Sequence, residues 1–331
     1  MALPCEWTDS LARPIFDGTA RESKPMSSSH HLVTGATSGI GLELAALLLA
    51  DPACRLVVGA RRPEAAKALR ALAGPDRLAI LPLDLASLAS TVAFAEAVER
   101  QLAGAKLASF SANAGLQAAG PRRLTADGYE ETFQANFLGH ALLIARLRRH
   151  LVPSAPVVLT ASGTHDPANR LARRFGFRGG LFVGADHVAK GELDPAASAK
   201  QLDRDRYATS KLCAILYVYA VTRRASAGDA RFIAFDPGLM PGTGLARERS
   251  AVERWAWSNV LPLLAHAMPG TSTARRSALA LAKLLTGRAF PSGRGLHVDF
   301  TLAETPSSRG SRREDWQEEL LRFADCAALE P

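Results

Sequence analysis

The sequence has few of the features that mark secreted, metal-binding or membrane-spanning proteins. Only four cysteines occur among 331 residues, Cys5, Cys54, Cys213 and Cys326. They form no C-x-x-C pair and no cluster with histidine, which argues against a zinc site and a disulfide framework. No apolar run approaches the roughly 20 residues of a membrane-spanning helix, and residues 1–29 lack the apolar segment of a secretory signal. We therefore expect a cytoplasmic protein with no transmembrane segment and no bound metal.

Aromatic residues are also scarce, at 6% of the chain, and they are not interleaved with basic residues as in RNA-binding proteins. The formal net charge of +8 reflects an excess of arginine. A composition rich in alanine and arginine explains that excess, and the basic run 309–313 is typical of a solvated loop. We therefore expect no nucleic-acid partner, although a basic surface suits an anionic cofactor.

The hydrophobic pattern is that of a parallel sheet, because short apolar runs alternate with longer helical periods from residue 31 onward. We expect strands at 31–33, 55–60, 78–83, 107–111, 156–161, 231–236 and 295–300, and helices at 40–49, 65–72, 89–101, 128–150, 207–224, 245–264 and 273–285. This order predicts a single Rossmann-type α/β fold, a doubly wound parallel sheet of about seven strands with helices on both faces.

The segments outside this pattern divide the chain. Residues 1–29 are interpreted as a flexible leader, 30–303 as the catalytic Rossmann domain, and 304–331 as a C-terminal extension. Residues 163–206 form a long insert that is rich in glycine, arginine and aspartate and has no sustained period. Since loops of this length are usually functional or mobile, the insert is expected to bear on function.

A glycine-rich turn follows the first expected strand and opens the first helix. Its spacing is G-x-x-x-G-x-G. Glycine permits a tight turn and lets backbone N–H groups approach a pyrophosphate at the positive end of a helix. The turn therefore predicts a dinucleotide site, formed by Gly35, Thr37, Ser38, Gly39, Ile40 and Gly41.

The end of the second strand indicates which dinucleotide is bound. An NAD site usually places a carboxylate there, as an acceptor for the ribose 2′-hydroxyl. This chain has Arg61 and Arg62 instead, with no acid before Glu64. A guanidinium suits a 2′-phosphate, which favours NADP(H) with Arg61 as its ligand. The alternative is that both arginines simply begin a solvated helix.

Tyr207 and Lys211 are spaced i, i+4, so they share one helix face. An isolated phenol, with a pKa near 10, is a poor proton carrier at neutral pH. A neighbouring ammonium is expected to lower that pKa, so the pair would act as an acid/base unit on a carbonyl oxygen that receives a hydride. The pair is common on ordinary helices, and it gains meaning only beside the glycine-rich turn.

Several motifs together resemble the short-chain dehydrogenase/reductase family over residues 32–300. They are TGATSGIG, Asp84-Leu85, Asn113-Ala114-Gly115, Asn136, Ser162, Tyr207 with Lys211, and Pro237-Gly238. The resemblance implies that Ser162 holds the substrate oxygen and that Asn136 anchors a water in a proton relay. It also implies cofactor contacts from Asp84, Leu85, Asn113, Ala114, Gly115, Tyr207, Lys211, Pro237, Gly238 and Thr243. By contrast, His140 is expected to pack against the sheet, outside the chemistry.

The same resemblance places a substrate lid at residues 240–272, where Trp255 and Trp257 suggest a bulky hydrophobic carbonyl or alcohol substrate. Parts of the chain look like light-dependent protochlorophyllide reductases, among them the insert and the run PGLMPGTGL. However, Ser111-Ala112 precedes Asn113, where that branch has a cysteine before the asparagine. Reduction of a C=C bond, or binding of NADP(H) without turnover, are therefore alternatives. Family members often form homo-oligomers through two long helices beside the site, and the insert could alter such pairing.

Overall fold

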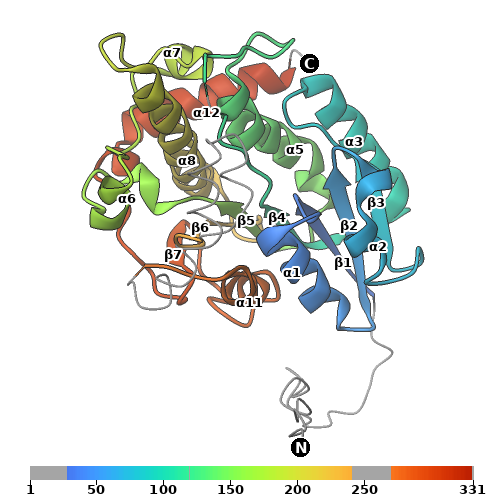
Figure 1. Ribbon diagram of the computed structural model, residues 1–331. Helices are drawn as coiled ribbons and strands as arrows, with labels where there is room; N and C mark the ends of the chain where they lie inside the picture. Colours follow the sequence, from blue (N-terminus) through green and yellow to red (C-terminus); the bar gives the residue numbers. More distant parts are fainter. Residues whose placement is uncertain (1–27, 119, 241–269, 330–331) are drawn as a thin grey trace, which may run out of the picture.

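The structure is a computed structural model, which describes residues 28–118, 120–240 and 270–329. Seven parallel strands form one twisted sheet in the order β3-β2-β1-β4-β5-β6-β7 (Figure 1). The strands are β1 (Ser29–Thr34), β2 (Cys54–Ala60), β3 (Leu78–Pro82), β4 (Leu107–Ala112), β5 (Pro156–Thr160), β6 (Arg231–Asp236) and β7 (Leu296–Asp299). The strand order reverses between β1 and β4, where such sheets bind ligands. The predicted fold class is confirmed.

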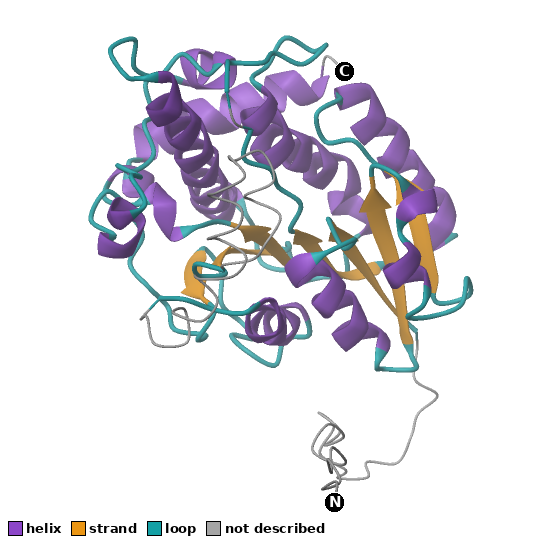
Figure 2. Ribbon diagram, in the orientation of Figure 1, coloured by secondary structure: helices purple, strands orange, loops and turns teal. Residues whose placement is uncertain are grey.

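Helices cover both faces of the sheet (Figure 2). The longer ones are α1 (Gly39–Leu49), α3 (Leu88–Leu102), α5 (Gly139–Leu147), α8 (Ala199–Arg224), α11 (Ala274–Leu285) and α12 (Glu314–Leu329). The short ones are η1 (Pro63–Ala65), α2 (Lys67–Arg70), α4 (Glu131–Phe133), η2 (Gln134–Leu138), η3 (Arg148–His150), η4 (Gly163–His165), α6 (Arg170–Arg174), α7 (Ala185–Lys190) and η7 (Gly310–Arg312). Helices α1 and α11 pack on one face, while α3, α5 and α8 cover the other.

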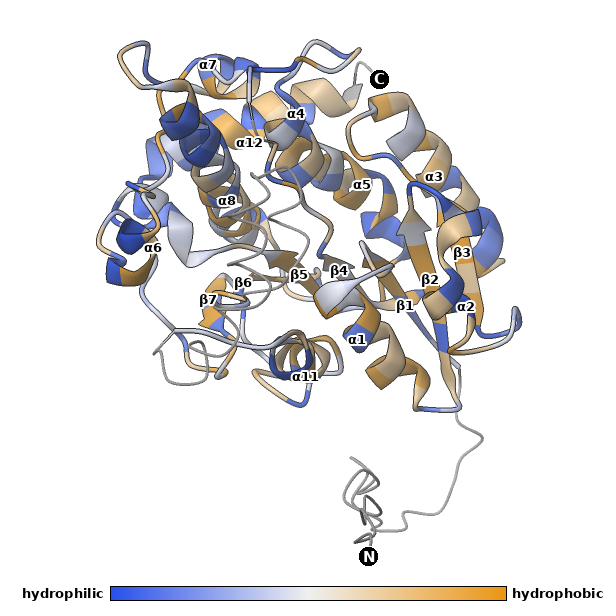
Figure 3. Ribbon diagram, viewed as in Figure 1, coloured by the Kyte–Doolittle hydropathy of each residue, from blue (hydrophilic) through white to orange (hydrophobic). Residues whose placement is uncertain are grey.

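The core consists of two apolar layers separated by the sheet, as the hydrophobic strands in Figure 3 indicate. Neighbouring strand residues point to opposite faces, so Val57 joins the layer under α3, α5 and α8, whereas Val58 joins the layer under α1 and α11. Because both faces are covered, the strands are mostly apolar, and several of their few polar residues, such as Thr34 and His297, are buried. The sheet therefore holds the ends of its strands in a fixed frame for the loops that follow them.

Two expected helices differ in the structure. In place of a helix over 65–72, the chain forms only the short turns η1 and α2. The expected helix over 128–150 begins at Glu131, since Gly128 has a positive φ of 80°, and residues 134–138 form a π-helical turn. A π-turn inserts one residue into the helical ladder and is frequent at functional sites. Here it contains Asn136.

The insert is more regular than its composition suggests. It contains α6 and α7, and α8 begins at Ala199, eight residues before Tyr207, with Ser198 as its N-cap. The C-terminal extension also contains a helix that the sequence pattern did not predict. This helix, α12, packs over α8 and α5 through buried Leu320, Leu321 and Ala324. Tertiary burial, not local propensity, fixes these elements.

The expected helix over 245–264, and with it Trp255 and Trp257, lies outside the described residues. Within the described ranges, no helix combines the length and the apolarity needed to cross a bilayer. The same residues contain no group of three or more His, Cys, Asp or Glu side chains placed to hold a metal ion.

Candidate active site

A crevice of about 350 Å³ lies at the carboxyl ends of β1, β2 and β4. It brings together most of the residues that the sequence proposes for cofactor binding: Gly35, Thr37, Ser38, Gly39, Ile40, Arg61, Asp84, Leu85, Asn113, Ala114, Gly115, Tyr207, Lys211 and Pro237. Gly41 and Gly238 do not line this crevice, and Thr243 lies outside the described residues. Residues from six separate motifs therefore meet at the switch point of the sheet.

The glycine-rich turn fits tightly against β4. Gly35 has a φ of 71°, and a Cβ atom there would lie 2.7 Å from the Cα atom of Ala114. A Cβ atom on Gly41 would lie 2.3 Å from the carbonyl oxygen of Gly35. Both positions therefore require glycine. The tight turn places the N-terminus of α1 at the crevice, where no side chain caps its N–H groups.

Thr34 and Asn113 hold this turn against the end of β4 through hydrogen bonds. The Asn113 amide donates to the carbonyl oxygens of Thr34 at 3.1 Å and Gly35 at 3.3 Å. The Thr34 hydroxyl oxygen accepts the backbone N–H groups of Asn113 and Ala114, both at 3.0 Å. The sequence singled out Asn113 but not Thr34, whose only signal is its place at the start of the TGATSGIG motif.

His140 completes these contacts from the helix side. Burial lowers the pKa of His140 to about 4, so its imidazole is neutral near pH 7. Its Nδ1–H lies 3.3 Å from the carbonyl oxygen of Asn136, which leaves Nε2 to accept the Thr34 hydroxyl proton at 2.9 Å. His140 therefore has a structural place against the sheet, away from both cavities, as the sequence suggests.

Arg61 follows β2 directly and lines the crevice, while the adjacent Arg62 does not. Both side chains are exposed, and Arg61 forms no ion pair with the described residues. No carboxylate stands at the end of β2. The crevice thus presents an exposed guanidinium at the end of β2.

Asn136 links the π-turn to the loop after β4. Its Oδ1 accepts the N–H of Leu116 at 2.8 Å, and its Nδ2 donates to the carbonyl oxygen of Leu116 at 2.8 Å and to the Ser210 hydroxyl at 3.0 Å. Both amide protons of Asn136 are therefore used by protein groups. This geometry shows that Asn136 positions the loop after β4, while the water relay expected at Asn136 stays a prediction.

Lys211 lies deep in the crevice. Its ammonium donates to the carbonyl oxygen of Thr160 at 2.9 Å and lies 5.6 Å from the centre of the Tyr207 ring. A Cβ atom on Gly115 would lie 3.4 Å from Lys211 Nζ, so glycine keeps the approach to the ammonium open. Burial lowers the pKa of Lys211 to about 8, against the opposing negative charge of Asp236. The side chain is still mostly charged near pH 7.

The phenol of Tyr207 corrects one expectation. The neighbouring ammonium was expected to lower its pKa, but burial raises the pKa of Tyr207 to about 12. A hydrogen bond with Ser162 works in the opposite direction, and the carboxylate of Asp236 adds to the rise. Desolvation of the phenolate, aided by Asp236, outweighs the hydrogen bond with Ser162. Tyr207 therefore holds its proton near neutral pH, the state that a proton donor requires.

Ser162 stands beside Tyr207, just after β5. Its hydroxyl oxygen accepts the N–H of Thr164 at 3.3 Å and the Thr164 hydroxyl proton at 3.1 Å. Its carbonyl oxygen accepts Nδ1–H of buried His165 at 2.6 Å. These contacts fix the turn that aims the Ser162 hydroxyl at the phenol.

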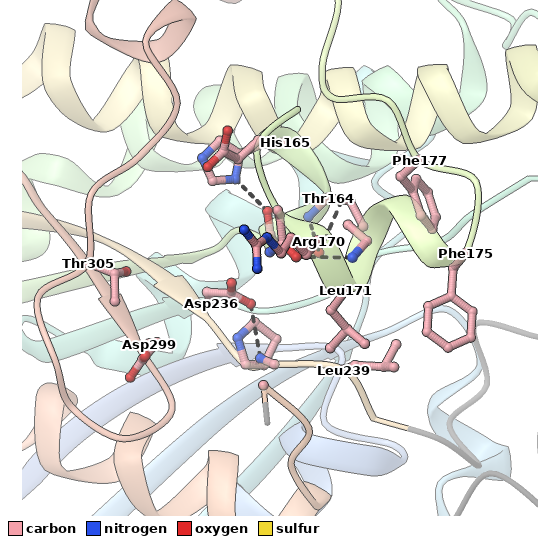
Figure 4. Close-up of a pocket in the computed structure, with 18 of the residues that line it drawn as sticks. Thr164, His165, Arg170, Leu171, Phe175, Phe177, Asp236, Leu239, Asp299 and Thr305 are labelled. Atoms are coloured by element: carbon pink, nitrogen blue, oxygen red, sulfur yellow. Dashed lines mark hydrogen bonds between the residues drawn. The ribbon is translucent and has the colours of Figure 1, made fainter. Parts of the chain in front are cut away.

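A second, larger cavity of about 670 Å³ opens on the far side of Tyr207. Figure 4 shows its two unlike sides: Leu171, Phe175, Phe177 and Leu239 lie opposite His165, Asp236, Asp299 and Thr305. Tyr207 lines this cavity as well as the crevice, together with Gln117, Pro237 and Met240. The phenol therefore stands where the two cavities meet.

Comparison with known proteins gives the family of this chain. The family model for short chain dehydrogenase matches residues 29–169. The short-chain dehydrogenase fogG of Aspergillus ruber is 30% identical over 246 residues, 69% of this chain. The "Probable oxidoreductase" of Streptomyces lividans is 31% identical over 270 residues, 77% of this chain and 81% of that relative.

This chain covers a smaller share of the length of some relatives, fogG among them. The chain spans 65% of the length of fogG and 56% of the chloroplastic protochlorophyllide reductase B of Oryza sativa, which is 31% identical over 236 residues, 66% of this chain. Among solved structures, the NADPH-bound carbonyl reductase from chicken fatty liver has a TM-score of 0.60 at 19% identity, covering 85% of this chain and 100% of that one. On these matches, the chain belongs to the short-chain dehydrogenase/reductase family.

Proposed function

We propose that this protein is an NADP(H)-dependent oxidoreductase that interconverts a carbonyl and an alcohol on a bulky hydrophobic substrate. The observation that carries the proposal is the place of Tyr207, which lines both the dinucleotide crevice and the larger cavity. A substrate held in the larger cavity could place its reacting carbon beside Tyr207, where a nicotinamide bound in the crevice could reach it.

The residues of the crevice fit a nicotinamide dinucleotide. The N–H groups at the start of α1 suit a pyrophosphate, and the free guanidinium of Arg61 suits a 2′-phosphate. Asp84 and Leu85 lie where an adenine would end, and Pro237 borders the junction with Tyr207. A bound nicotinamide would supply or accept the hydride.

The chain's own groups would handle the proton. With a pKa of about 12, Tyr207 is protonated near pH 7 and can donate to a carbonyl oxygen as it gains negative charge. Ser162, hydrogen-bonded to the phenol, is placed to hold the same oxygen. The ammonium of Lys211, 5.6 Å from the ring centre, stabilises the phenolate left behind.

Residues 30–303 form the proposed catalytic unit, in which the insert 163–206 helps to build the substrate side. Leu171, Phe175 and Phe177 of the insert line the larger cavity, which supports a hydrophobic substrate. The free thiols of Cys54, Cys213 and Cys326 support a reducing compartment such as the cytoplasm.

A panel of aliphatic, aromatic and polycyclic ketones and aldehydes, followed by NADPH absorbance, tests the proposal. We expect NADPH consumption with at least one bulky apolar carbonyl, and more slowly with NADH. Binding of NADPH without consumption on any member would favour the non-catalytic alternative.

The similarity to protochlorophyllide reductase B supports a second candidate, light-dependent C=C reduction. Running the same panel with protochlorophyllide, in darkness and under illumination, separates the two. Loss of the pigment only in light would replace carbonyl reduction with this candidate.

A further inference from the structure

One buried polar atom in the larger cavity is not explained by carbonyl reduction alone. His297, on β7, is only 4% exposed, yet its Nε2 has no hydrogen-bond partner among the described residues. Its Nδ1 lies 3.1 Å from the carbonyl oxygen and 3.0 Å from the hydroxyl of Thr305. A carbonyl oxygen can only accept, so Nδ1 carries a proton and Nε2 remains available. His297 lines the larger cavity, and an unsatisfied buried polar atom on such a residue is unusual.

The Asp236 carboxyl, at the end of β6, lines the same cavity. One of its oxygens accepts the N–H of Gly238 at 3.0 Å, and Gly163 N–H provides a second backbone bond. These donors leave lone pairs free, since a carboxylate has about four acceptor sites. Within the described chain no hydrogen bond or ion pair joins Asp236 to His297, but His297 is close enough to lower the pKa of the Asp236 carboxyl against the rise from burial.

The other carboxylate on this side, Asp299, is engaged through one oxygen by the turn that follows it. One Asp299 oxygen accepts the N–H groups of Thr301 and Ala303 and the Thr301 hydroxyl proton at 2.8, 3.3 and 2.6 Å. His165 is saturated, because Nδ1 donates to Ser162 and Nε2 accepts the N–H of Ser308 at 3.2 Å. Asp236, with fewer hydrogen bonds than Asp299, and His297 therefore keep capacity for a ligand on this side.

We propose that Asp236 and His297 recognise a hydroxyl group of the substrate, so that the substrate is a hydroxylated carbonyl compound or the corresponding diol. When the pair shares one proton, one member donates and the other accepts. A hydroxyl matches this pair because it also donates one hydrogen bond and accepts another. An ether or a ketone could only accept, and an ammonium could only donate.

The position of the pair sets where that hydroxyl lies relative to the reacting carbon. The charge of Asp236 acts on both Tyr207 and Lys211, so the carboxyl is near the proton donor. Leu171, Phe175 and Leu239 lie on the opposite side of the cavity (Figure 4). The substrate would therefore place its carbonyl at Tyr207, its hydroxyl at the polar side and its hydrocarbon at the apolar side. This arrangement rests on the proposed carbonyl chemistry at Tyr207.

Calorimetric binding to the NADPH complex tests the inference without requiring turnover. The ligands are decan-2-one and its derivatives with one hydroxyl on the third, fourth, seventh or tenth carbon. We expect at least one derivative to bind about tenfold more tightly than decan-2-one, the gain of a hydrogen bond to a charged or buried group. No gain for any derivative in the wild-type protein would overturn the inference.

Two substitutions of His297 form a matched pair. His297→Asn keeps an amide near the position of Nδ1 for Thr305 and removes Nε2, whereas His297→Gln keeps an amide near Nε2. We expect the hydroxyl preference to disappear in His297→Asn and to persist in part in His297→Gln. An equal preference in His297→Asn and wild type, with matching melting temperatures, would also refute the site.

The same ligands separate this inference from the proposed function. A hydroxyl preference in binding, with no NADPH consumed on any of them, would retain the recognition site and contradict carbonyl reduction on these ketones. NADPH consumption without any hydroxyl preference in binding would support carbonyl reduction and contradict the recognition site.

Discussion

The crevice takes most of its lining from the ends of β1 to β4 and the loops that follow them, whereas the larger cavity takes its lining from segments that are far apart in the chain. Gly35, Arg61 and Asn113 each stand at the end of a strand, in register with the sheet. In contrast, His165, Asp236 and Thr305 meet only because η4, β6 and the segment after β7 are packed together. The crevice, the proposed cofactor side, is thus set mainly by strand ends, and the larger cavity, the proposed substrate side, by long-range packing.

The crevice and the larger cavity also differ in the kind of groups that line them. On the crevice side, backbone groups and glycines dominate, as in the hydrogen bonds between Thr34 and Asn113. On the substrate side, side chains meet side chains, and polar groups face apolar ones across one cavity. A backbone-lined site can hold the same cofactor in many proteins, while a site lined by side chains can change its ligand by substitution.

Tyr207→Phe would test the junction of the two sides and should have the largest effect. Removing the hydroxyl removes the proposed proton donor, so we expect kcat to fall by about 100-fold or more. The Kd of NADPH, measured by fluorescence titration, should change little, since the ring remains in place.

Tyr219→Phe on the same helix is the matched control. It removes one hydrogen bond, to Ser307 at 2.7 Å, and neither cavity is lined by it. Equal losses of turnover in the two variants would mean that Tyr207 acts through stability and not as a proton donor.

Arg61→Ala would test the role of the crevice alone, without changing the larger cavity. Loss of a charge-assisted contact with a 2′-phosphate should raise the Kd of NADPH by about tenfold or more, while the Kd of NADH should stay nearly constant. The neighbouring Arg62→Ala, which changes an exposed residue outside the crevice, should leave both values unchanged. If NADPH and NADH weakened equally, Arg61 would not bind the phosphate.

The pH dependence of kcat/KM should report on Lys211. Since burial lowers its pKa to about 8, the ammonium is lost as the pH rises through that value, and kcat/KM should decline. The free energy of unfolding should change with pH in the opposite direction to kcat/KM. Between pH 8 and the ordinary pKa of 10.5, the unfolded chain binds the extra proton, so this group makes folding more favourable as pH rises.

Lys211→Arg distinguishes the two effects, because a guanidinium keeps its charge over this range. The alkaline decline of kcat/KM should then shift upward or vanish. A decline at the same pH in Lys211→Arg would assign it to another group.

The smallest expected effect concerns self-association. Helix α12 packs over α8 and α5. These are long helices beside the site, of the kind through which the family resemblance leads us to expect pairing. Arg223 and Arg224 bind Glu318 across that contact, and Trp316 stacks on Phe182 at 5.2 Å between ring centres. We therefore expect light scattering to give the mass of one chain. A stable dimer would show that another face associates.

Much of the crevice could be predicted from the sequence. The strand ends, the glycine spacing and the i, i+4 relation of Tyr207 to Lys211 are local patterns whose geometry follows from backbone periodicity. Arg61 and Asn113 each follow a strand directly. The correct order of strands is therefore enough to predict that both lie at one edge of the sheet.

The pKa of Tyr207 and the partners of Asn136 could not be predicted in this way. The first depends on how completely the phenol is buried, and the second on a π-turn that brings Asn136 against Leu116. Helix α12 was missed for a similar reason, since its apolar face is explained by α8 and α5, which lie far earlier in the chain.

The sequence by itself indicated the individual strands and the glycine-rich turn, because each is a pattern of residues close together along the chain, and the order of the motifs indicated the family. Only the tertiary structure decided that Asp236 and His297 share a cavity with Tyr207, and which of their atoms remain free. The physical reason is that hydrogen-bond satisfaction and desolvation depend on neighbours in space, and these neighbours come from strands β6 and β7 and from the C-terminal extension.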